Sequence, residues 1–122
     1  MALTTPLPTV PDSRQYLGAG ATQESFLIIP GTSDYPTSGY VIKPLDCRLM
    51  RGFQAAWITG ANAATIAGPW EMYPIMTLSL LSSGAAQLQT QINLYVTNGS
   101  MVQVGNGTNL SGATWVLTVI GS

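Results

Sequence analysis

Residues 88–96, LQTQINLYV, alternate between two kinds of side chain along their whole length. One side of this segment carries Leu88, Thr90, Ile92, Leu94 and Val96. The other side, continued back to position 87, carries Gln87, Gln89, Gln91, Asn93 and Tyr95. Successive side chains of a β-strand point to opposite faces, so this period of two predicts a strand with one buried and one solvated face.

A turn and a return strand are expected directly after this segment. The dipeptide Asn98-Gly99 suits a two-residue hairpin turn, in which both central residues need a positive φ. Residues 101–104, MVQV, would form the return strand, and residues 105–107, GNG, the next turn. This part of the chain is therefore predicted to be an antiparallel hairpin.

The final strand is expected at residues 114–120, TWVLTVI, which are rich in β-branched and aromatic side chains. One face of this strand would carry Trp115, Leu117 and Val119. The other face would carry Thr114, Val116, Thr118 and Ile120. Both faces are largely apolar, which predicts a strand covered on both sides, in a central or partner-covered position.

Shorter strands are expected nearer the N-terminus, at residues 26–29, 40–42, 52–59 and 72–81, with a buried helix as the alternative for the last. Turn-rich loops at 31–39, 60–69 and 82–84 separate them, and Pro44 suits the start of one helical turn within 44–50. About seven or eight short strands with frequent turns predict an all-β, antiparallel β-sandwich or barrel, jelly-roll-like in type. Residues 15–122 would form this single β domain.

Residues 1–14 are predicted to form an extended N-terminal arm. They contain Pro6, Pro8 and Pro11, and proline disfavours both helices and central strands. A disordered tail is the alternative, but Leu3, Leu7 and Val10 are apolar and charge is nearly absent. An arm that docks on a neighbouring subunit would explain both features.

Charge is scarce in this chain: nine residues, or 7%, are charged, where about 25% is typical. A soluble monomer normally carries mixed surface charge, and interface cores are depleted in Lys, Glu and Asp. The composition therefore favours a packed assembly over a Thr/Asn-rich β protein that simply lacks charge. No basic cluster, no run of 18 apolar residues and no secretory signal occur in the sequence, so neither nucleic-acid binding nor membrane insertion is expected.

The sequence offers few residues for catalysis. It contains no histidine, which removes the usual general base and the commonest metal ligand. No phosphate-binding glycine motif occurs, and Asp34, Asp46 and Glu71 stand singly, as turn-forming or capping residues do. Asp46 could also pair with Arg48 or Arg51 at the surface. No catalytic, cofactor or metal site is expected, so the chain is predicted not to be an enzyme.

Three smaller features have structural interpretations. Cys47 is the only cysteine, so no internal disulfide is possible, and a buried thiol is favoured over a reactive one. N-x-[ST] triplets occur at Asn98, Asn106 and Asn109, and turn composition accounts for them. Trp57 and Trp115 lie in predicted strands and are expected in the core.

Trp70 and Tyr73 lie in an irregular stretch between Gly68 and Pro74 and have two interpretations. Tryptophan and tyrosine dominate interface hot spots, which favours an anchor for a protein partner. The alternative is an exposed platform for a carbohydrate or receptor. With Leu3, Leu7 and Val10 of the arm, these two residues are the predicted interface.

Three segments, in this order along the chain, resemble small structural proteins of tailed bacteriophages. Residues 33–42, SDYPTSGYVI, resemble the family's S-x-Y-P-T-G-G-Y segment, which precedes a short helix and a strand. Residues 93–104, NLYVTNGSMVQV, resemble its hairpin, in which a tyrosine-bearing strand meets an Asn-Gly turn. Residues 109–121, NLSGATWVLTVIG, resemble its closing segment, D-L-S-G followed by a strand ending in Ile-Gly.

The chain also departs from this pattern. Ser38 stands where the family has its first glycine, and Asn109 stands where it has aspartate. The resemblance implies a virion structural protein, assembled in the host cytoplasm, that decorates or cements the capsid. Its partners would be the major capsid protein or another virion protein, and copies of itself, for which a trimer is one candidate. The alternative function is a carbohydrate- or receptor-binding module of a phage tail or spike, with Trp70 and Tyr73 lining a cleft.

Low charge generates a first prediction, that assembly depends only weakly on salt. Salt screens the interactions between charges, and contacts without ion pairs lose little binding free energy by this screening. Raising NaCl from about 0.05 M to about 0.5 M should therefore change the apparent association constant less than about threefold. The measurement is the mass in solution at both salt concentrations. Release of the protein from its assembly by moderate salt would contradict it.

Overall fold

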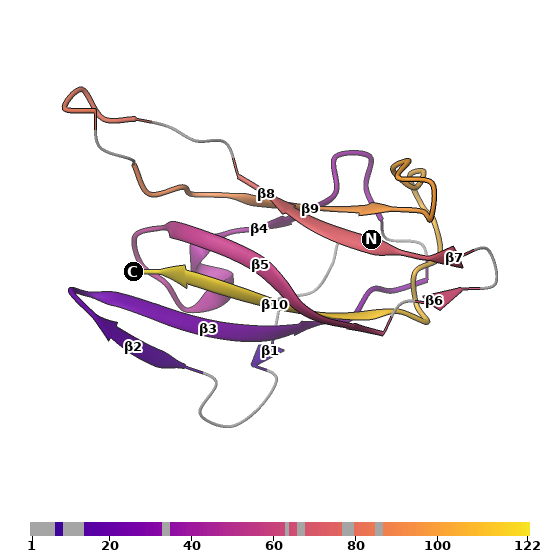
Figure 1. Ribbon diagram of the computed structural model, residues 1–122, viewed down its shortest axis with the longest axis horizontal. Coiled ribbons are helices and arrows are strands. Elements are labelled where there is room, and N and C mark those ends of the chain that lie inside the picture. The colour runs from indigo at the N-terminus through magenta and orange to yellow at the C-terminus, as the bar shows by residue number, and fades with distance from the viewer. Residues whose placement is uncertain are drawn as a thin grey trace.

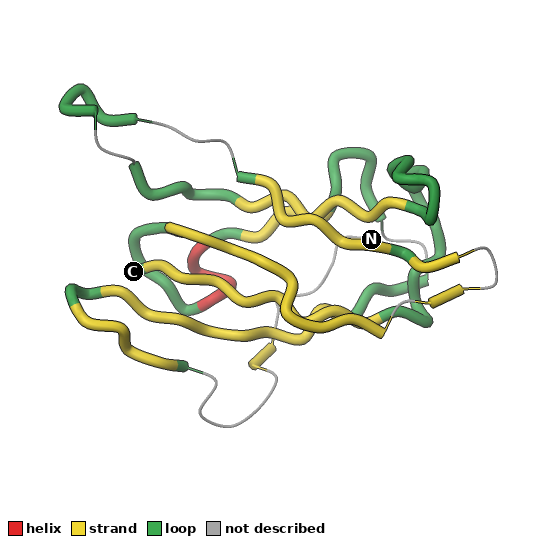
Figure 2. The backbone as a smooth tube through the Cα atoms, in the orientation of Figure 1, coloured by secondary structure: helices red, strands yellow, loops and turns green. Residues whose placement is uncertain are grey.

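The computed structural model describes residues 7–8, 14–32, 35–62, 64–65, 68–76, 80–84 and 87–122. Two antiparallel sheets face each other with the hydrophobic core between them (Figure 1). The one helix in these ranges is a short 3-10 turn (Figure 2). The predicted all-β antiparallel architecture is confirmed, in the form of a sandwich.

The large sheet consists of β1 (Leu7–Pro8), β2 (Gln15–Gly18), β3 (Ala21–Ile28), β5 (Phe53–Asn62) and β10 (Thr114–Gly121). Its order is β1-β3-β10-β5, and β2 also pairs with β3. The small sheet has the order β4-β9-β8 and consists of β4 (Tyr40–Ile42), β8 (Glu71–Ile75) and β9 (Ile92–Thr97). A two-stranded hairpin, β6 (Ala64–Thr65) and β7 (Gly68–Pro69), lies between β5 and β8 in the chain.

The alternation in residues 88–96 correctly predicts β9. Ile92, Leu94 and Val96 are fully buried, and the residues between them are half-buried on the other face. The strand starts at Ile92, later than expected, because the preceding residues leave the small sheet. Gln89 instead exchanges two backbone hydrogen bonds with Phe53 of β5, at 2.7 and 2.9 Å.

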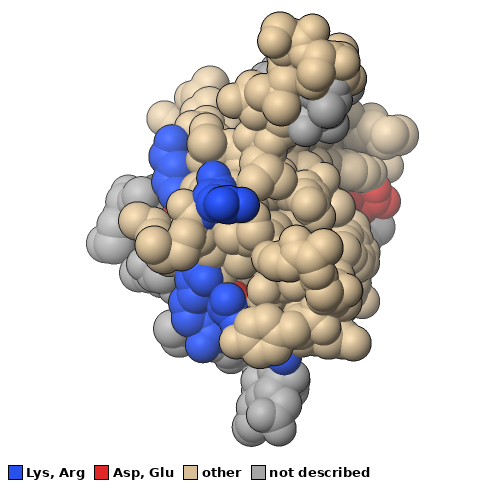
Figure 3. All heavy atoms as spheres, turned by 90° about the vertical axis from the view of Figure 1, so that its left-hand side faces the viewer, with Lys and Arg blue, Asp and Glu red and all other residues tan. Residues whose placement is uncertain are grey.

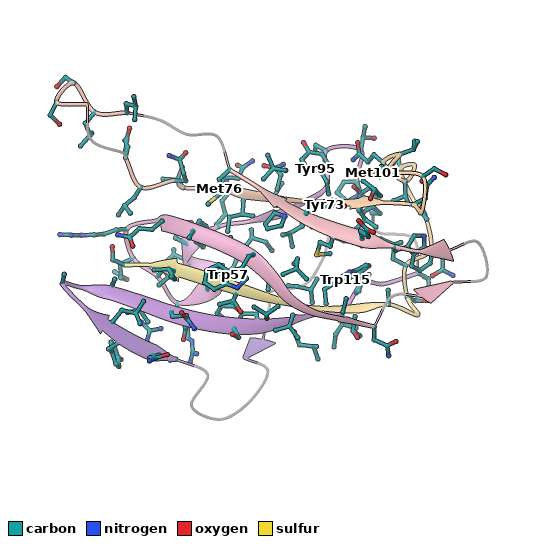
Figure 4. The ribbon with its side chains drawn as sticks, in the orientation of Figure 1. Trp57, Tyr73, Met76, Tyr95, Met101 and Trp115 are labelled. Carbon is teal, nitrogen blue, oxygen red and sulfur yellow. The ribbon has the colours of Figure 1, made fainter. Side chains whose placement is uncertain are left out.

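β10 is the central strand of the large sheet, as its two apolar faces predict. It pairs along one edge with β3 and along the other with β5. Trp115, Leu117 and Val119 are buried, and Trp115 lies between the two layers (Figure 4). On the opposite face Thr118 is also buried, whereas Val116 and Ile120 remain half-buried.

Two predictions for the neighbouring strand β5 are wrong. Residues 60–62, expected as a loop, continue β5, because the backbone ladder to β10 extends as far as Asn62 opposite Thr114. Small side chains do not prevent backbone pairing. Trp57, expected in the core, is 38% exposed. It lies opposite Thr118, on the face of the large sheet that points away from the small sheet.

The predicted helical turn is a 3-10 helix, η1 (Pro44–Cys47). Asp46 accepts a hydrogen bond at Oδ2 from the backbone N–H of Lys43, at 2.8 Å. This confirms the capping role expected for Asp46. Cys47 is buried, also as expected.

The described part of the segment SDYPTSGYVI holds the small sheet together; Ser33 and Asp34 lie outside the described residues. Tyr35 is fully buried, and its hydroxyl accepts hydrogen bonds from the backbone N–H of Val96 (3.0 Å) and from Nε2 of Gln103 (2.9 Å). Gly39 has a φ of +80°, and a Cβ there would lie 2.6 Å from the carbonyl oxygen of Leu94. Only glycine tolerates both conditions.

The N-terminal arm is described only in part, and Leu3 and Val10 lie outside the described residues. Its residues Leu7 and Pro8 form β1, which pairs with Leu27 and Phe26 of β3 in the same chain. This stretch of the arm is therefore an edge strand of its own large sheet.

The turn after β9 differs from the predicted two-residue hairpin. The residue with a positive φ is Met101 (φ 62°) rather than Gly99. The backbone N–H of Asn98 donates to the carbonyl of Val102 at 2.8 Å, which closes a three-residue loop. Asn98 Oδ1 accepts from the N–H groups of Ser100 (2.8 Å) and Val102 (3.2 Å). The side chain of Asn98 thus shapes the turn. Met101 is the third residue of the loop, the position that is commonly left-handed in three-residue hairpin loops.

We predict that Met101→Gly stabilises the protein. A side chain in the left-handed region costs about 1 kcal/mol, and Met101 is 74% exposed, so little burial is lost. The midpoint of thermal unfolding should rise by about 4 °C. Ser100→Gly is the matched control, because Ser100 does not have a positive φ and its replacement should lower the midpoint. A decrease of the same size in both variants would contradict the prediction.

Candidate functional site

The two aromatic residues predicted at an interface do not form one platform. Trp70 is half-buried and packs against the core cluster, so its ring stabilises the sandwich. Tyr73 lies in β8 next to the buried Met72 and therefore points to the outer face of the small sheet. Its cross-strand partner there is Tyr95 of β9 (Figure 4). Tyr95, which the sequence placed on the polar face of its strand, thus joins Tyr73 on this surface.

A depression of about 280 Å³ opens on this outer face beside Tyr95. We name it the amide groove, and its lining residues are Ile75, Gln89, Thr90, Gln91, Asn93 and Tyr95. The alternation of residues 88–96 predicted the polar side of this strand but did not indicate a site there. The signal was the repeat of amide side chains at alternate positions ending in a tyrosine.

Hydrogen bonds orient the amide side chains of the groove. Lys43 Nζ donates to Gln91 Oε1 at 2.7 Å, and Gln91 Nε2 donates to Asn93 Oδ1 at 2.9 Å. Asn93 Nδ2 in turn donates to the carbonyl oxygen of Ser38 at 3.0 Å. This chain of bonds fixes which end of each amide is the oxygen and which is the nitrogen.

A tyrosine–carboxylate pair lies beside the groove. The hydroxyl of Tyr73 donates a hydrogen bond to Oε2 of Glu71. This bond and the negative charge of Glu71 raise the pKa of Tyr73 above its ordinary value. Tyr73 therefore remains a neutral phenol throughout the physiological pH range.

The tertiary structure gathers basic side chains that the sequence spreads out. Lys and Arg side chains collect on the end of the sandwich shown in Figure 3. This basic end carries Arg14, Lys43, Arg48 and Arg51. The fold therefore brings to one end four basic side chains that the sequence spreads over residues 14–51. The two acidic residues Glu24 and Asp46 partly neutralise this end.

Glu24 is a fully buried carboxylate beneath the basic end. It lies on the inner line of β3, between Thr22 and Phe26. Its Oε1 pairs with Nη1 of Arg14 (2.9 Å) and with Nη2 of Arg48. A buried charge is strongly unfavourable unless it is paired. The predicted surface pair of Asp46 with Arg48 is wrong, because Arg48 reaches Glu24 and Asp46 caps η1 instead.

The outer face of the large sheet differs from the basic end, because the outward side chains of its central strands carry no charge. Trp57 lies near its middle, opposite Thr118. The hydroxyl of Thr118 is within hydrogen-bonding distance of those of Ser25 (2.9 Å) and Thr59 (3.1 Å). We name this surface the uncharged face, and its residues are Gln23, Ser25, Leu27, Ala55, Trp57, Thr59, Val116, Thr118 and Ile120.

Three findings on the described ranges concern metal binding, membrane-spanning helices and thiol reactivity. Within them no three His, Cys, Asp or Glu side chains gather closely enough to hold a metal ion. No helix of the described chain is long and apolar enough to cross a membrane. Burial, followed by the negative charges of Asp46 and Glu24, raises the pKa of the Cys47 thiol to about 12.

No protein-family model, curated protein or solved structure matches this chain. The structural features that bear on function are three surfaces: the amide groove, the basic end and the uncharged face.

We predict that Cys47 resists thiol reagents as long as the protein is folded. A thiolate is the reactive species, and a pKa of about 12 leaves almost none at pH 8. In the unfolded chain the pKa returns to about 8.5, so urea should restore rapid labelling by a disulfide reagent. The pKa of Cys47 is higher in the folded protein than in the unfolded chain. The protonated thiol therefore contributes fully to the free energy of unfolding below about pH 8.5, and this contribution is lost as the pH rises toward 12. Rapid labelling without denaturant would contradict this prediction.

Proposed function

We propose that this chain is a non-enzymatic structural subunit of a tailed-bacteriophage virion. It would decorate or cement the capsid by packing against copies of itself and against the major capsid protein or another virion protein. The observation that carries the assembly part of the proposal is the uncharged face. The virion context comes from the resemblance of residues 33–42, 93–104 and 109–121 to small phage structural proteins.

The uncharged face suits burial against a partner because it combines apolar area with a central aromatic anchor. Trp57 is 38% exposed, and Leu27, Val116 and Ile120 are half-buried around the same strands. Tryptophan anchors surrounded by uncharged residues are typical of interface hot spots. Covering this face would bury apolar area that the isolated chain leaves in water.

The hydroxyl groups of this face can be buried at low cost. The hydroxyls of Ser25, Thr118 and Thr59 already bond to one another in a row across three strands. A polar group that has a partner inside the protein loses little when a neighbouring subunit displaces water. A partner can therefore exclude water from these hydroxyls at little cost, whereas unpaired hydroxyls would lose their hydrogen bonds to water.

The acidic side chains that the structure describes have structural roles, which supports a non-enzymatic function. Glu24 pairs with two arginines, Asp46 caps η1 and Glu71 accepts the hydroxyl of Tyr73. Cys47 is a buried thiol whose raised pKa keeps it protonated. The sequence has no histidine, and these assignments give a structural role to each carboxylate and to the thiol that the structure describes.

The segments that carry the family resemblance are occupied by residues that build the fold. Tyr35 and Gly39 close the small sheet, Asn98 shapes the turn after β9, and the last segment supplies β10. The resemblance therefore concerns residues with strong structural constraints. The virion role is proposed from this resemblance in sequence.

We expect the chain to self-associate, and we expect Trp57→Arg to prevent this. The mass in solution at about 10 µM protein, a concentration at which contacts of micromolar affinity form, should be a multiple of 12.8 kDa. A buried arginine without a partner is strongly unfavourable, so the variant should be a monomer. Ile75→Arg is the matched control, because Ile75 is an apolar residue, 49% exposed, on the outer face of the small sheet.

Circular dichroism of both variants shows whether the fold persists. A wild-type chain that remains a monomer, alone and with isolated capsid proteins, would refute the assembly proposal. Loss of association in Ile75→Arg but not in Trp57→Arg would show that the contact lies on the small sheet, against the proposal.

A further inference from the structure

We propose that the amide groove binds a neutral saccharide. This function goes beyond assembly, and it uses the opposite side of the sandwich from the uncharged face (Figure 1). A subunit packed through the large sheet would still present the small sheet, and with it the groove, to the solvent.

The amide side chains provide the hydrogen bonds that sugar hydroxyls need. Each amide nitrogen carries two hydrogens. Among the described residues, the network uses one from Gln91, toward Asn93, and one from Asn93, toward Ser38. Each amide thus has a further N–H and oxygen lone pairs for a ligand. A sugar hydroxyl both donates and accepts, so it matches a surface that offers both functions in fixed positions.

Aromatic and apolar side chains beside the amides suit the other surface of a sugar ring. Tyr95 lines the groove, and Tyr73 lies directly across from it on β8. The negative face of an aromatic ring attracts the slightly positive C–H groups on the flat side of a pyranose. Ile75 adds an apolar contact at the neighbouring position. Hydrogen bonds from one wall and C–H contacts from another are the two interactions that a saccharide combines.

The size and charge of the groove select the ligand class. Its volume of about 280 Å³ lies at the small end of ligand pockets, so one or two sugar rings fit better than a larger cofactor. Its six lining residues are uncharged, which disfavours strongly ionic ligands. The nearby Lys43 already donates to Gln91, and the nearby Glu71 accepts the hydroxyl of Tyr73. The size and charge of the groove therefore favour a neutral, hydroxyl-rich ligand.

One half of the groove lies on paired strands, and the other half is formed by residues 89–91, which precede β9 in the chain. Asn93 and Tyr95 belong to β9, which is paired on one side with β4 and on the other with β8. Side chains on a central strand are held more accurately than side chains on loops. Asn93 and Tyr95 therefore need little ordering on binding, and this favours measurable affinity at a shallow site.

The test is a nuclear magnetic resonance titration of the ¹⁵N-labelled full chain with maltotriose, with triacetylchitotriose and with lactose, each up to about 10 mM. We expect at least one of these neutral probes to shift the side-chain amide signals of Gln91 and Asn93. The dissociation constant should be about 1 mM, as expected for a shallow site. Absence of such shifts with all three probes would overturn the proposal.

Variants then locate the binding. Tyr95→Ala should weaken it about tenfold through loss of the aromatic contact. Gln91→Ala, at an exposed position that should not affect folding, should weaken it about fivefold. Tyr16→Ala is the matched control, because Tyr16 is a 77% exposed tyrosine on the large sheet. Unchanged affinity in Gln91→Ala, or equal weakening in Tyr16→Ala, would overturn the assignment to the groove without touching the assembly proposal.

Discussion

β10 is hydrogen-bonded along both edges, to β3 on one side and to β5 on the other, and the large sheet exists because of this double pairing. The inner side chains of the strand, among them Trp115 and Leu117, form the middle of the core. Its outer residue Thr118 links the hydroxyls of Ser25 and Thr59. One strand therefore fills the core and also prepares the uncharged face for contact with a partner.

The two outer faces of the sandwich have different chemistry for a physical reason. On the large sheet, apolar and hydroxyl side chains satisfy one another, so the face can lose its water cheaply. On the small sheet, Gln91 and Asn93 are oriented by bonds but still have donors and acceptors to offer. A molecule built this way would pack through one face and present the other. The basic end lies between them, above the buried carboxylate of Glu24.

Sequence patterns were most reliable where burial alone selects the structure. β9 and β10 followed from alternation and from β-branched residues, and Cys47 and Asp46 had their expected places. Predictions failed where backbone pairing or turn geometry prevailed over side-chain type. β5 continued through Gly60 and Ala61 because β10 supplied a ladder, and Met101 took the left-handed position that Gly99 was expected to occupy.

The sequence by itself determined the class of the fold, the strands of the core and the scarcity of reactive groups, because these depend on composition and on a period of two along one segment. Only the tertiary structure decided which distant residues meet. It brought Arg14 and Arg48 onto Glu24, placed Tyr73 opposite Tyr95, and turned Trp57 outward. Such meetings depend on strand order and register, and no local pattern in the chain encodes which strand will lie beside which.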